Sequence, residues 1–80
     1  MIGMSKKVTV YSKTICMRCD LAKKYLDNLN IPYDTVNVEE DEYALLYVKQ
    51  LGAQSMPVII AEGHEPIFGF APEKLARLVE

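Results

Sequence analysis

The sequence predicts an α/β fold in which four short strands form one mixed sheet flanked by three helices, in the order β-α-β-α-β-β-α. Three observations support this prediction. Alternating or continuous apolar segments are separated by segments with helical apolar spacing. Proline, glycine and other turn residues stand at the boundaries between them. With 80 residues, half of them hydrophobic and a quarter charged, the chain suits one small globular domain, residues 1–80.

The first half of the chain predicts a strand, a helix and a second strand. Residues 7–11 alternate and carry β-branched side chains, which is typical of a strand. Apolar residues recur at helical spacing over residues 16–29, and Asn30-Ile31-Pro32 should end the helix because the residue before proline avoids the α region. Residues 33–38 predict a more polar strand near a sheet edge. Because a helix connects the two strands, we expect them to be parallel.

A second helix and a central strand follow. Acidic residues 39–42 should load the start of the helix with negative charge, which is favourable at that end, and they are expected to be solvated. Gly52 is placed to follow the C-terminus of this helix. Pro57 then introduces the apolar residues 58–60, a run typical of a strand covered on both faces.

The end of the chain predicts a hairpin and a last helix. Residues 62–65 have turn composition, so residues 66–68 can return as a short antiparallel edge strand. Pro72 suits the first turn of a helix. This order of elements resembles the thioredoxin-like architecture.

The chain has two cysteines, Cys16 and Cys19, at the predicted junction of the first strand and the first helix. Unpaired backbone N–H groups at a helix start, the helix dipole and the nearby cations Lys13 and Arg18 all favour a thiolate at Cys16. Cys16 should therefore attack a substrate disulfide and form a mixed disulfide. Cys19, one helical turn on and more buried, should resolve it. This pattern predicts thiol–disulfide exchange.

Two other roles for the cysteine pair stay open. A structural disulfide that closes so small a ring would stabilise the fold by only about 2 kcal/mol. Zinc normally takes four ligands, and His64 is the single further candidate, on a predicted turn. A binding module would therefore need two chains that share zinc or an iron–sulfur cluster through their thiolates.

Composition argues against several classes of protein. The net charge of -2 is too small for a nucleic-acid or acidic-membrane binder. The N-terminal residues contain no apolar signal-peptide core, and the longest apolar run, residues 56–61, is far shorter than the roughly 20 residues that span a bilayer. We therefore expect a cytoplasmic protein, where a C-x-x-C pair is more often catalytic or metal-binding than structural.

Four segments resemble the glutaredoxin branch of the thioredoxin superfamily, and within it the NrdH-redoxins. They are residues 8–13, 16–19, 56–59 and 69–73. The resemblance implies that Cys16 is the nucleophile and Cys19 the resolving cysteine. It also implies a cis Met56–Pro57 bond against the disulfide, with the Met56 backbone turned outward to pair with an extended substrate strand.

NrdH-redoxins look like glutaredoxins in sequence but behave like thioredoxins. The resemblance implies reduction by thioredoxin reductase, which uses NADPH, and electron donation to class Ib ribonucleotide reductase. Glutathione-binding glutaredoxins usually carry a Gly-Gly pair before the last helix, where this chain has a lone Gly69, so we expect weak glutathione binding or none. A monomer without bound cofactor or metal is expected. The residues expected to contact substrate are Lys13, Arg18, Met56, Pro57, Phe68, Gly69 and Phe70.

The alternative function is that of a glutathione-dependent dithiol glutaredoxin, acting as a general protein disulfide reductase. In such proteins a lysine at the position of Lys13 can meet a glutathione carboxylate. The chain also has Phe68 and Ala71 where NrdH-redoxins typically have serine and arginine. Phe68 and Phe70 predict either an exposed apolar contact patch or, for at least one of them, packing under the last helix.

Overall fold

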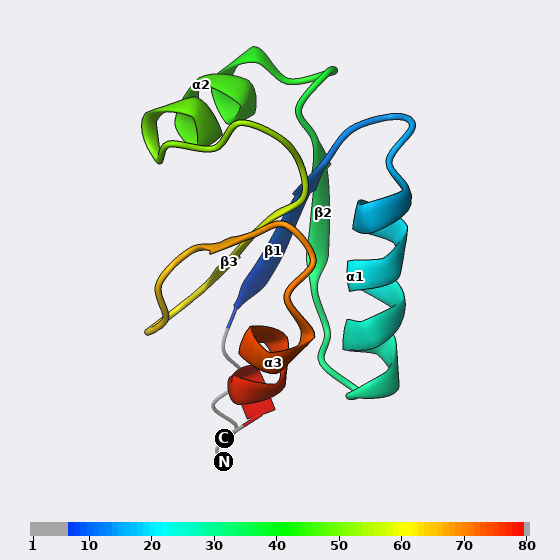
Figure 1. Cartoon of the computed structure of the whole chain (residues 1–80). Helices are drawn as coiled ribbons and strands as arrows, with labels where there is room; N and C mark the ends of the chain where they lie inside the picture. Colours follow the sequence, from blue (N-terminus) through cyan, green and yellow to red (C-terminus); the bar gives the residue numbers. More distant parts are fainter. Residues whose placement is uncertain (1–6, 80) are drawn as a thin grey trace.

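The structure, a computed structural model that describes residues 7–79, contains a mixed sheet of four strands in the order β2-β1-β3-β4. β1 pairs parallel with β2 and antiparallel with β3, and β3 pairs antiparallel with β4. The strands are β1 (Val8–Ser12), β2 (Asp34–Asn37), β3 (Val58–Ala61) and β4 (Ile67–Phe68). The helices are α1 (Met17–Asn28), α2 (Glu42–Gln50) and α3 (Pro72–Leu75), the last continued by a 3₁₀ turn, Ala76–Val79. The predicted α/β fold and its element order are confirmed (Figure 1).

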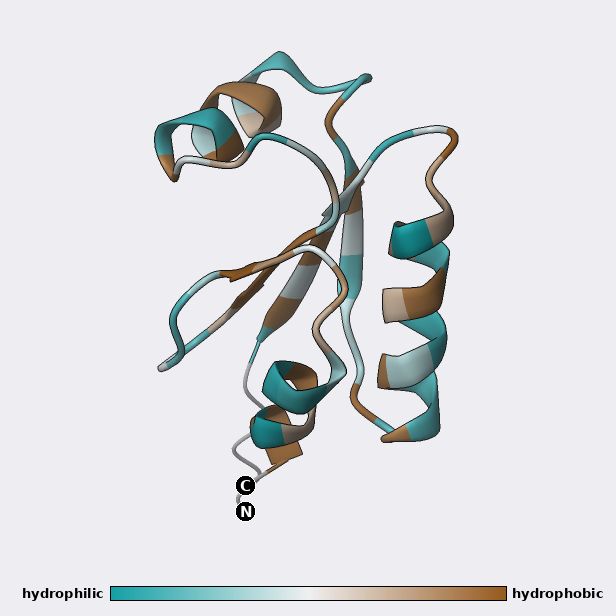
Figure 2. Cartoon of the chain, viewed as in Figure 1, coloured by the Kyte–Doolittle hydropathy of each residue, from teal (hydrophilic) through white to brown (hydrophobic). Residues whose placement is uncertain are grey.

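The side chains of β3 alternate between two hydrophobic layers. Ile59 and Ala61 belong to the cluster that includes buried residues of α1 and α3, whereas Val58 and Ile60 pack in the cluster that includes buried residues of α2. Hydrophobic colouring is accordingly continuous along β3, inside the sheet (Figure 2). Full burial of a large aliphatic side chain, such as that of Val58 or Ile59, stabilises the fold by roughly 1.5–3 kcal/mol. β3 therefore contributes side chains to both layers and is covered on both faces, as its apolar run predicts.

The two longer helices end in the same hydrogen-bond pattern. After α1, the N–H groups of Asn30 and Ile31 donate to carbonyls of the last helical turn, and Asn30 has a φ of 60°. This is a Schellman arrangement, which needs a left-handed residue after the helix cap. The helix therefore ends within the predicted segment 30–32, through the left-handed backbone of Asn30 rather than through the restriction imposed by Pro32. Gly52, with a φ of 98°, takes the same place after α2, as predicted.

The acidic run of residues 39–42 is exposed throughout, as predicted, but it is divided between a turn and the helix start. Asp41 is the N-cap of α2, and its Oδ1 accepts a hydrogen bond from the N–H of Ala44 at 3.1 Å. Glu42 is the acidic residue of the first helical turn. Glu39 precedes the helix, in the turn after β2, and contacts another part of the chain.

Within residues 7–79, none of the helices is long and apolar enough to cross a membrane. The first six residues, on which the expectation of no export signal depends, lie outside the described residues.

Candidate active site

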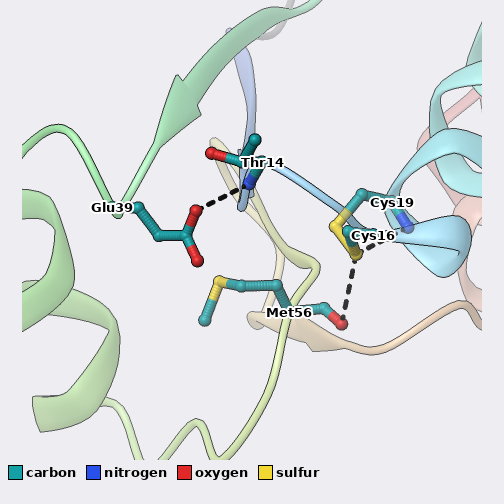
Figure 3. The surroundings of a disulfide bond; sticks show 5 residues. All are labelled: Thr14, Cys16, Cys19, Glu39 and Met56. Carbon is teal, nitrogen blue, oxygen red and sulfur yellow. Dashed lines mark hydrogen bonds between the residues drawn. A yellow bond between two sulfur atoms is a disulfide. The ribbon is translucent and has the colours of Figure 1, made fainter.

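Cys16 and Cys19 form a disulfide at the start of α1 (Figure 3). The two Sγ atoms are 2.16 Å apart and the two Cα atoms 5.2 Å apart. Cys16 is the N-cap of α1 and is partly exposed, whereas Cys19 lies inside the first turn and is only 1% exposed. The site therefore presents one sulfur atom to a partner and covers the other.

The helix start supplies a hydrogen-bond donor to the outer sulfur. The N–H of Cys19 donates to the Sγ of Cys16 at 3.1 Å, the pattern by which an N-cap side chain accepts from the third helical residue. A negative charge on this Sγ would gain from the same N–H and from the positive end of the helix dipole. The geometry therefore suits a sulfur that alternates between a disulfide and a thiolate.

The Met56–Pro57 peptide bond is cis and lies against the disulfide. The carbonyl oxygen of Met56 is 3.9 Å from the Sγ of Cys16 (Figure 3). Met56 and Pro57 are both buried, and the Met56 side chain packs in the cluster on the α2 side of the sheet. The N–H of Gly69 donates to the carbonyl of Pro57 at 2.9 Å, so the segment after β4 supports this loop.

Two adjoining hollows, of which the first is lined by Cys16, contain most of the other residues predicted for the site; Arg18 and Ser55 line both of them. One has a volume of about 250 Å³ and is lined by Lys13, Ile15, Cys16, Met17, Arg18, Ser55 and Met56. The other has a volume of about 300 Å³ and is lined by Arg18, Gly52, Ala53, Gln54, Ser55, Phe68 and Gly69. The structure thus brings Lys13, Arg18, Met56, Phe68 and Gly69 around the cysteines.

The lining of the first hollow includes two exposed apolar side chains, Ile15 and Met17, which the sequence analysis missed. Ile15 is 87% exposed and Met17 is 79% exposed, directly beside Cys16 in the chain. Neighbouring exposed apolar side chains of this size are typical of a surface that contacts a partner. Their position on either side of the first cysteine was the available signal in the sequence.

A second feature missed by the sequence analysis is a hydrogen-bond network behind the loop that leads to Cys16. The N–H of Thr14 donates to Oε1 of Glu39 at 3.0 Å (Figure 3), and Nδ2 of Asn37 donates to Oγ1 of Thr14 at 3.1 Å. Hydrogen bonds from the side chain and backbone of Thr14, together with the charge of Lys13, hold the pKa of the Glu39 carboxyl below its usual value. Glu39 is therefore ionised at neutral pH.

A sequence model of the glutaredoxin family matches residues 8–65 of the chain. This chain belongs to the glutaredoxin family. The match includes both cysteines and the Met56–Pro57 bond, so it covers the main parts of the site. The chain is a glutaredoxin-like thiol–disulfide redox protein whose redox centre is the Cys16–Cys19 disulfide.

Relatives of this glutaredoxin-family chain include the glutaredoxin-like protein NrdH of Lactococcus lactis subsp. lactis, 38% identical over 71 residues, which are 89% of this chain and 97% of that protein. The Gene 56 protein of Mycobacterium phage L5 is 38% identical over 74 residues, which are 91% of this chain and 72% of that protein. The solved structure of the glutaredoxin-like protein NrdH-redoxin from Escherichia coli has a TM-score of 0.85 at 28% identity and covers 90% of this chain and 93% of that one. The chain is NrdH-like, and its fold is thioredoxin-like.

The two phenylalanines near the last helix have different surroundings in this glutaredoxin-family fold. Phe68 is 46% exposed and lines the second hollow. Phe70 instead packs edge-on against Tyr25 of α1, with ring centroids 6.1 Å apart, beside the cluster shared by α1 and α3. It lines neither hollow beside the disulfide. Of the two alternatives raised by the sequence, inward packing therefore describes Phe70.

The described residues 7–79 contain no group of three or more His, Cys, Asp or Glu side chains placed to hold a metal ion. His64 lies in the turn after β3, whereas the cysteines lie near the other end of that strand, where Pro57 precedes it. His64 is therefore not placed to join the cysteines around one ion within a single chain.

Proposed function

We propose that this protein is a cytoplasmic dithiol electron carrier that works as a monomer of one domain. Thioredoxin reductase reduces it at the expense of NADPH, and it passes the electrons to class Ib ribonucleotide reductase. Its similarity to glutaredoxin-like NrdH proteins supports these partners, and the E. coli NrdH-redoxin is described as having a thioredoxin-like activity profile. It carries no bound cofactor or metal in this role.

The observation that carries the proposal is the unequal burial of the two sulfur atoms at a helix start. The partly exposed Cys16 can meet a substrate disulfide, whereas Cys19 at 1% exposure cannot. Cys19 is nevertheless already within bonding distance of the Cys16 sulfur. A structural disulfide needs neither an exposed sulfur nor donors aimed at it, so this arrangement favours exchange.

The reaction proceeds in two exchanges. The Cys16 thiolate attacks one sulfur of a substrate disulfide. A Cys16–substrate bond forms, the substrate disulfide breaks, and the second substrate sulfur leaves as a thiolate that takes up a proton. Cys19 then loses its proton and attacks the Cys16 sulfur, so that the Cys16–Cys19 bond reforms and the first substrate sulfur leaves as a thiol. Two electrons pass from the carrier to the substrate; one of the two protons comes from Cys19 and the other from solvent.

The groups around the disulfide would hold the substrate during these exchanges. The Met56 backbone, beside the Cys16 sulfur, would pair with an extended substrate segment. Lys13 and Arg18 would attract acidic groups, and Phe68 and Gly69 would line the second side of the contact. Phe70 would support this surface from below through its contact with Tyr25.

The test is a comparison of two reducing systems with insulin disulfides as the final acceptor. NADPH oxidation should be fast with thioredoxin reductase and slow with glutathione and glutathione reductase, and Cys16→Ser should abolish both. The reverse ranking would favour the alternative, a glutathione-dependent dithiol glutaredoxin acting as a general protein disulfide reductase. Reduction of a class Ib ribonucleotide reductase in place of insulin then tests the proposed acceptor.

A third outcome would place the protein in another class. Stoichiometric zinc or iron in freshly purified protein, together with a native mass of two chains, would indicate a module that shares a metal through its cysteine thiolates. The dithiol-carrier proposal requires a native mass of one chain and no bound metal.

A further inference from the structure

The loop that brings Cys16 to the site is not held by burial. Residues 13–15 are all exposed, and Ile15 is 87% exposed. On the helix side, Cys16 is anchored because its carbonyl accepts from the N–H of Asp20 at 3.1 Å. On the strand side, β1 ends at Ser12, so three exposed residues separate the sheet from the reactive sulfur. Some other contact has to hold this segment in place.

That contact is a closed set of hydrogen bonds between this loop and the turn after β2. The N–H of Thr14 donates to Oε1 of Glu39 at 3.0 Å, Nδ2 of Asn37 donates to Oγ1 of Thr14 at 3.1 Å, and the N–H of Glu39 donates to Oδ1 of Asn37 at 2.9 Å. The parallel pairing of Ser12 with Asn37 brings the two segments together, because both strands end at the same edge of the sheet. In Figure 3 the Glu39 side chain extends from its turn toward the backbone of Thr14.

We propose that Glu39 is a positioning residue for Cys16, which it holds at the start of α1 through its hydrogen bond to Thr14. This inference rests on the proposed function, because it concerns the reactivity of the Cys16 thiolate. With the loop anchored, the Cys16 sulfur stays in the N-cap position where the N–H of Cys19 reaches it. With the loop released, the sulfur spends less time there, and its thiolate loses that donor.

The carboxylate could also act through its charge, and two substitutions separate the two effects. Glu39→Ala and Glu39→Gln remove the same negative charge, but only glutamine keeps an oxygen that can accept from the N–H of Thr14. The facing charged group is Lys13, which both variants retain. A difference between the two variants therefore reports the hydrogen bond and not the charge.

The experiment measures how fast iodoacetamide alkylates Cys16 in the freshly reduced full-length protein, over a range of pH. Glu39→Ala should slow alkylation at neutral pH by about twofold to tenfold, the range expected for one hydrogen bond, and should raise the pH of half-maximal rate. Glu39→Gln should alkylate faster than Glu39→Ala and close to the wild-type rate. Asn37→Ala, which removes the second tether of Thr14, should slow the reaction in the same direction.

A matched control is available at the other end of the sheet. Oε1 of Glu62 accepts a hydrogen bond from the N–H of Lys7 at 3.4 Å, so Glu62→Ala removes a similar carboxylate–backbone contact far from the cysteines. Its alkylation rate should equal that of the wild type. Thermal unfolding of each variant shows whether a general loss of structure causes any slower alkylation. If Glu39→Ala does not fold, the alkylation rate of Asn37→Ala tests the inference instead.

Each possible pattern of alkylation rates either supports or overturns the inference. Equal rates for Glu39→Ala and Glu39→Gln overturn the inference, whether both are slow or both match the wild type. A slow Glu39→Ala that is rescued by glutamine supports it. Failure of the proposed function would be seen in the wild-type protein itself, as an absence of preferential alkylation at Cys16, and is therefore distinguishable.

Discussion

Replacement of Gly69 by alanine should weaken both folding and disulfide exchange, whereas the same replacement at Gly63 should weaken folding alone. The two glycines have almost the same left-handed backbone, with φ values of 78° and 80°, and an added Cβ would meet no atom within 4 Å at either position. They differ in location. The N–H of Gly69 donates to the carbonyl of Pro57 beside the cysteines, whereas Gly63 lies in the turn between β3 and β4.

The expected loss of stability follows from the backbone alone, since neither site has a steric clash. Alanine in the left-handed region costs about 1–2 kcal/mol, and the stiffer unfolded chain offsets about 0.4–1 kcal/mol of that. A net loss of about 1 kcal/mol corresponds to a fall in Tm of about 4–8 °C for a domain of this size. At Gly69 the hydrogen bond to Pro57 is disturbed as well, so exchange should slow by about twofold to tenfold.

The assay combines thermal unfolding of the oxidised protein, followed by circular dichroism, with insulin reduction well below both unfolding transitions. A loss of Tm in both variants, somewhat larger in Gly69→Ala because of its disturbed hydrogen bond, with a loss of activity in Gly69→Ala only, would support the reasoning. Equal losses of activity would mean that exchange simply follows stability. A normal rate in Gly69→Ala would show that the contact with Pro57 does not support the site.

Three further predictions concern the cysteines, the core and the acidic turn. Cys16→Ser should abolish disulfide reduction, and Cys19→Ser should accumulate a mixed disulfide with substrate, visible by mass spectrometry; turnover by Cys16→Ser would contradict the assignment. Leu26→Ala, at a fully buried core position, should lower the free energy of unfolding in urea by about 2–5 kcal/mol, and a loss below about 1 kcal/mol would contradict its packing. Because the pKa of Glu39 is lowered from the usual 4.5, its ionised form stabilises the fold above that pH, and this stabilisation is lost as the pH falls through the folded-state value. Glu39→Gln should therefore lower Tm at neutral pH, with a difference from the wild type that disappears on acidification.

The fold was predictable because local and long-range signals agree along this chain. The continuous apolar run after Pro57 forms the interior strand β3. Its successive side chains point to opposite faces of the sheet, so that they pack in both hydrophobic layers. β1 and β2 are parallel, as expected for two neighbouring strands that are connected by a helix and not by a tight turn. Strand and helix boundaries differ from the predictions by only one or two residues, as expected where caps decide the ends.

The Glu39–Thr14 contact was not predictable, because it joins residues 25 positions apart. Four consecutive acidic residues favour a helix start on charge alone, and nothing local shows which of them is the cap. In the structure Asp41 is the N-cap of α2, which leaves Glu39 in the preceding turn. Only the register of β1 with β2 then places Thr14 within its reach.

The sequence also left open which of Phe68 and Phe70 is exposed, and the reason differs from that for the Glu39–Thr14 contact. Strand alternation would give both side chains the same face, because they are two residues apart. Gly69 between them has a φ of 78°, so the backbone leaves the strand geometry before Phe70 is reached. The backbone at Gly69, and not the spacing of the two aromatic residues, therefore determines which one enters the core.

The reduced site offers the Cys16 sulfur two competing partners, and their strengths decide its charge. A thiol could donate to the Met56 carbonyl, but thiols are weak donors and the distance is 3.9 Å. In the disulfide the N–H of Cys19 already donates to the Cys16 sulfur at 3.1 Å, and a thiolate would strengthen this hydrogen bond, because hydrogen bonds to charged groups are roughly twice as strong as neutral ones. The helix dipole adds about 0.3–1 kcal/mol in the same direction. Both effects favour the thiolate over the thiol. Because a thiolate cannot donate to the Met56 carbonyl, that oxygen would be available to a backbone N–H group of an incoming substrate in the proposed cycle.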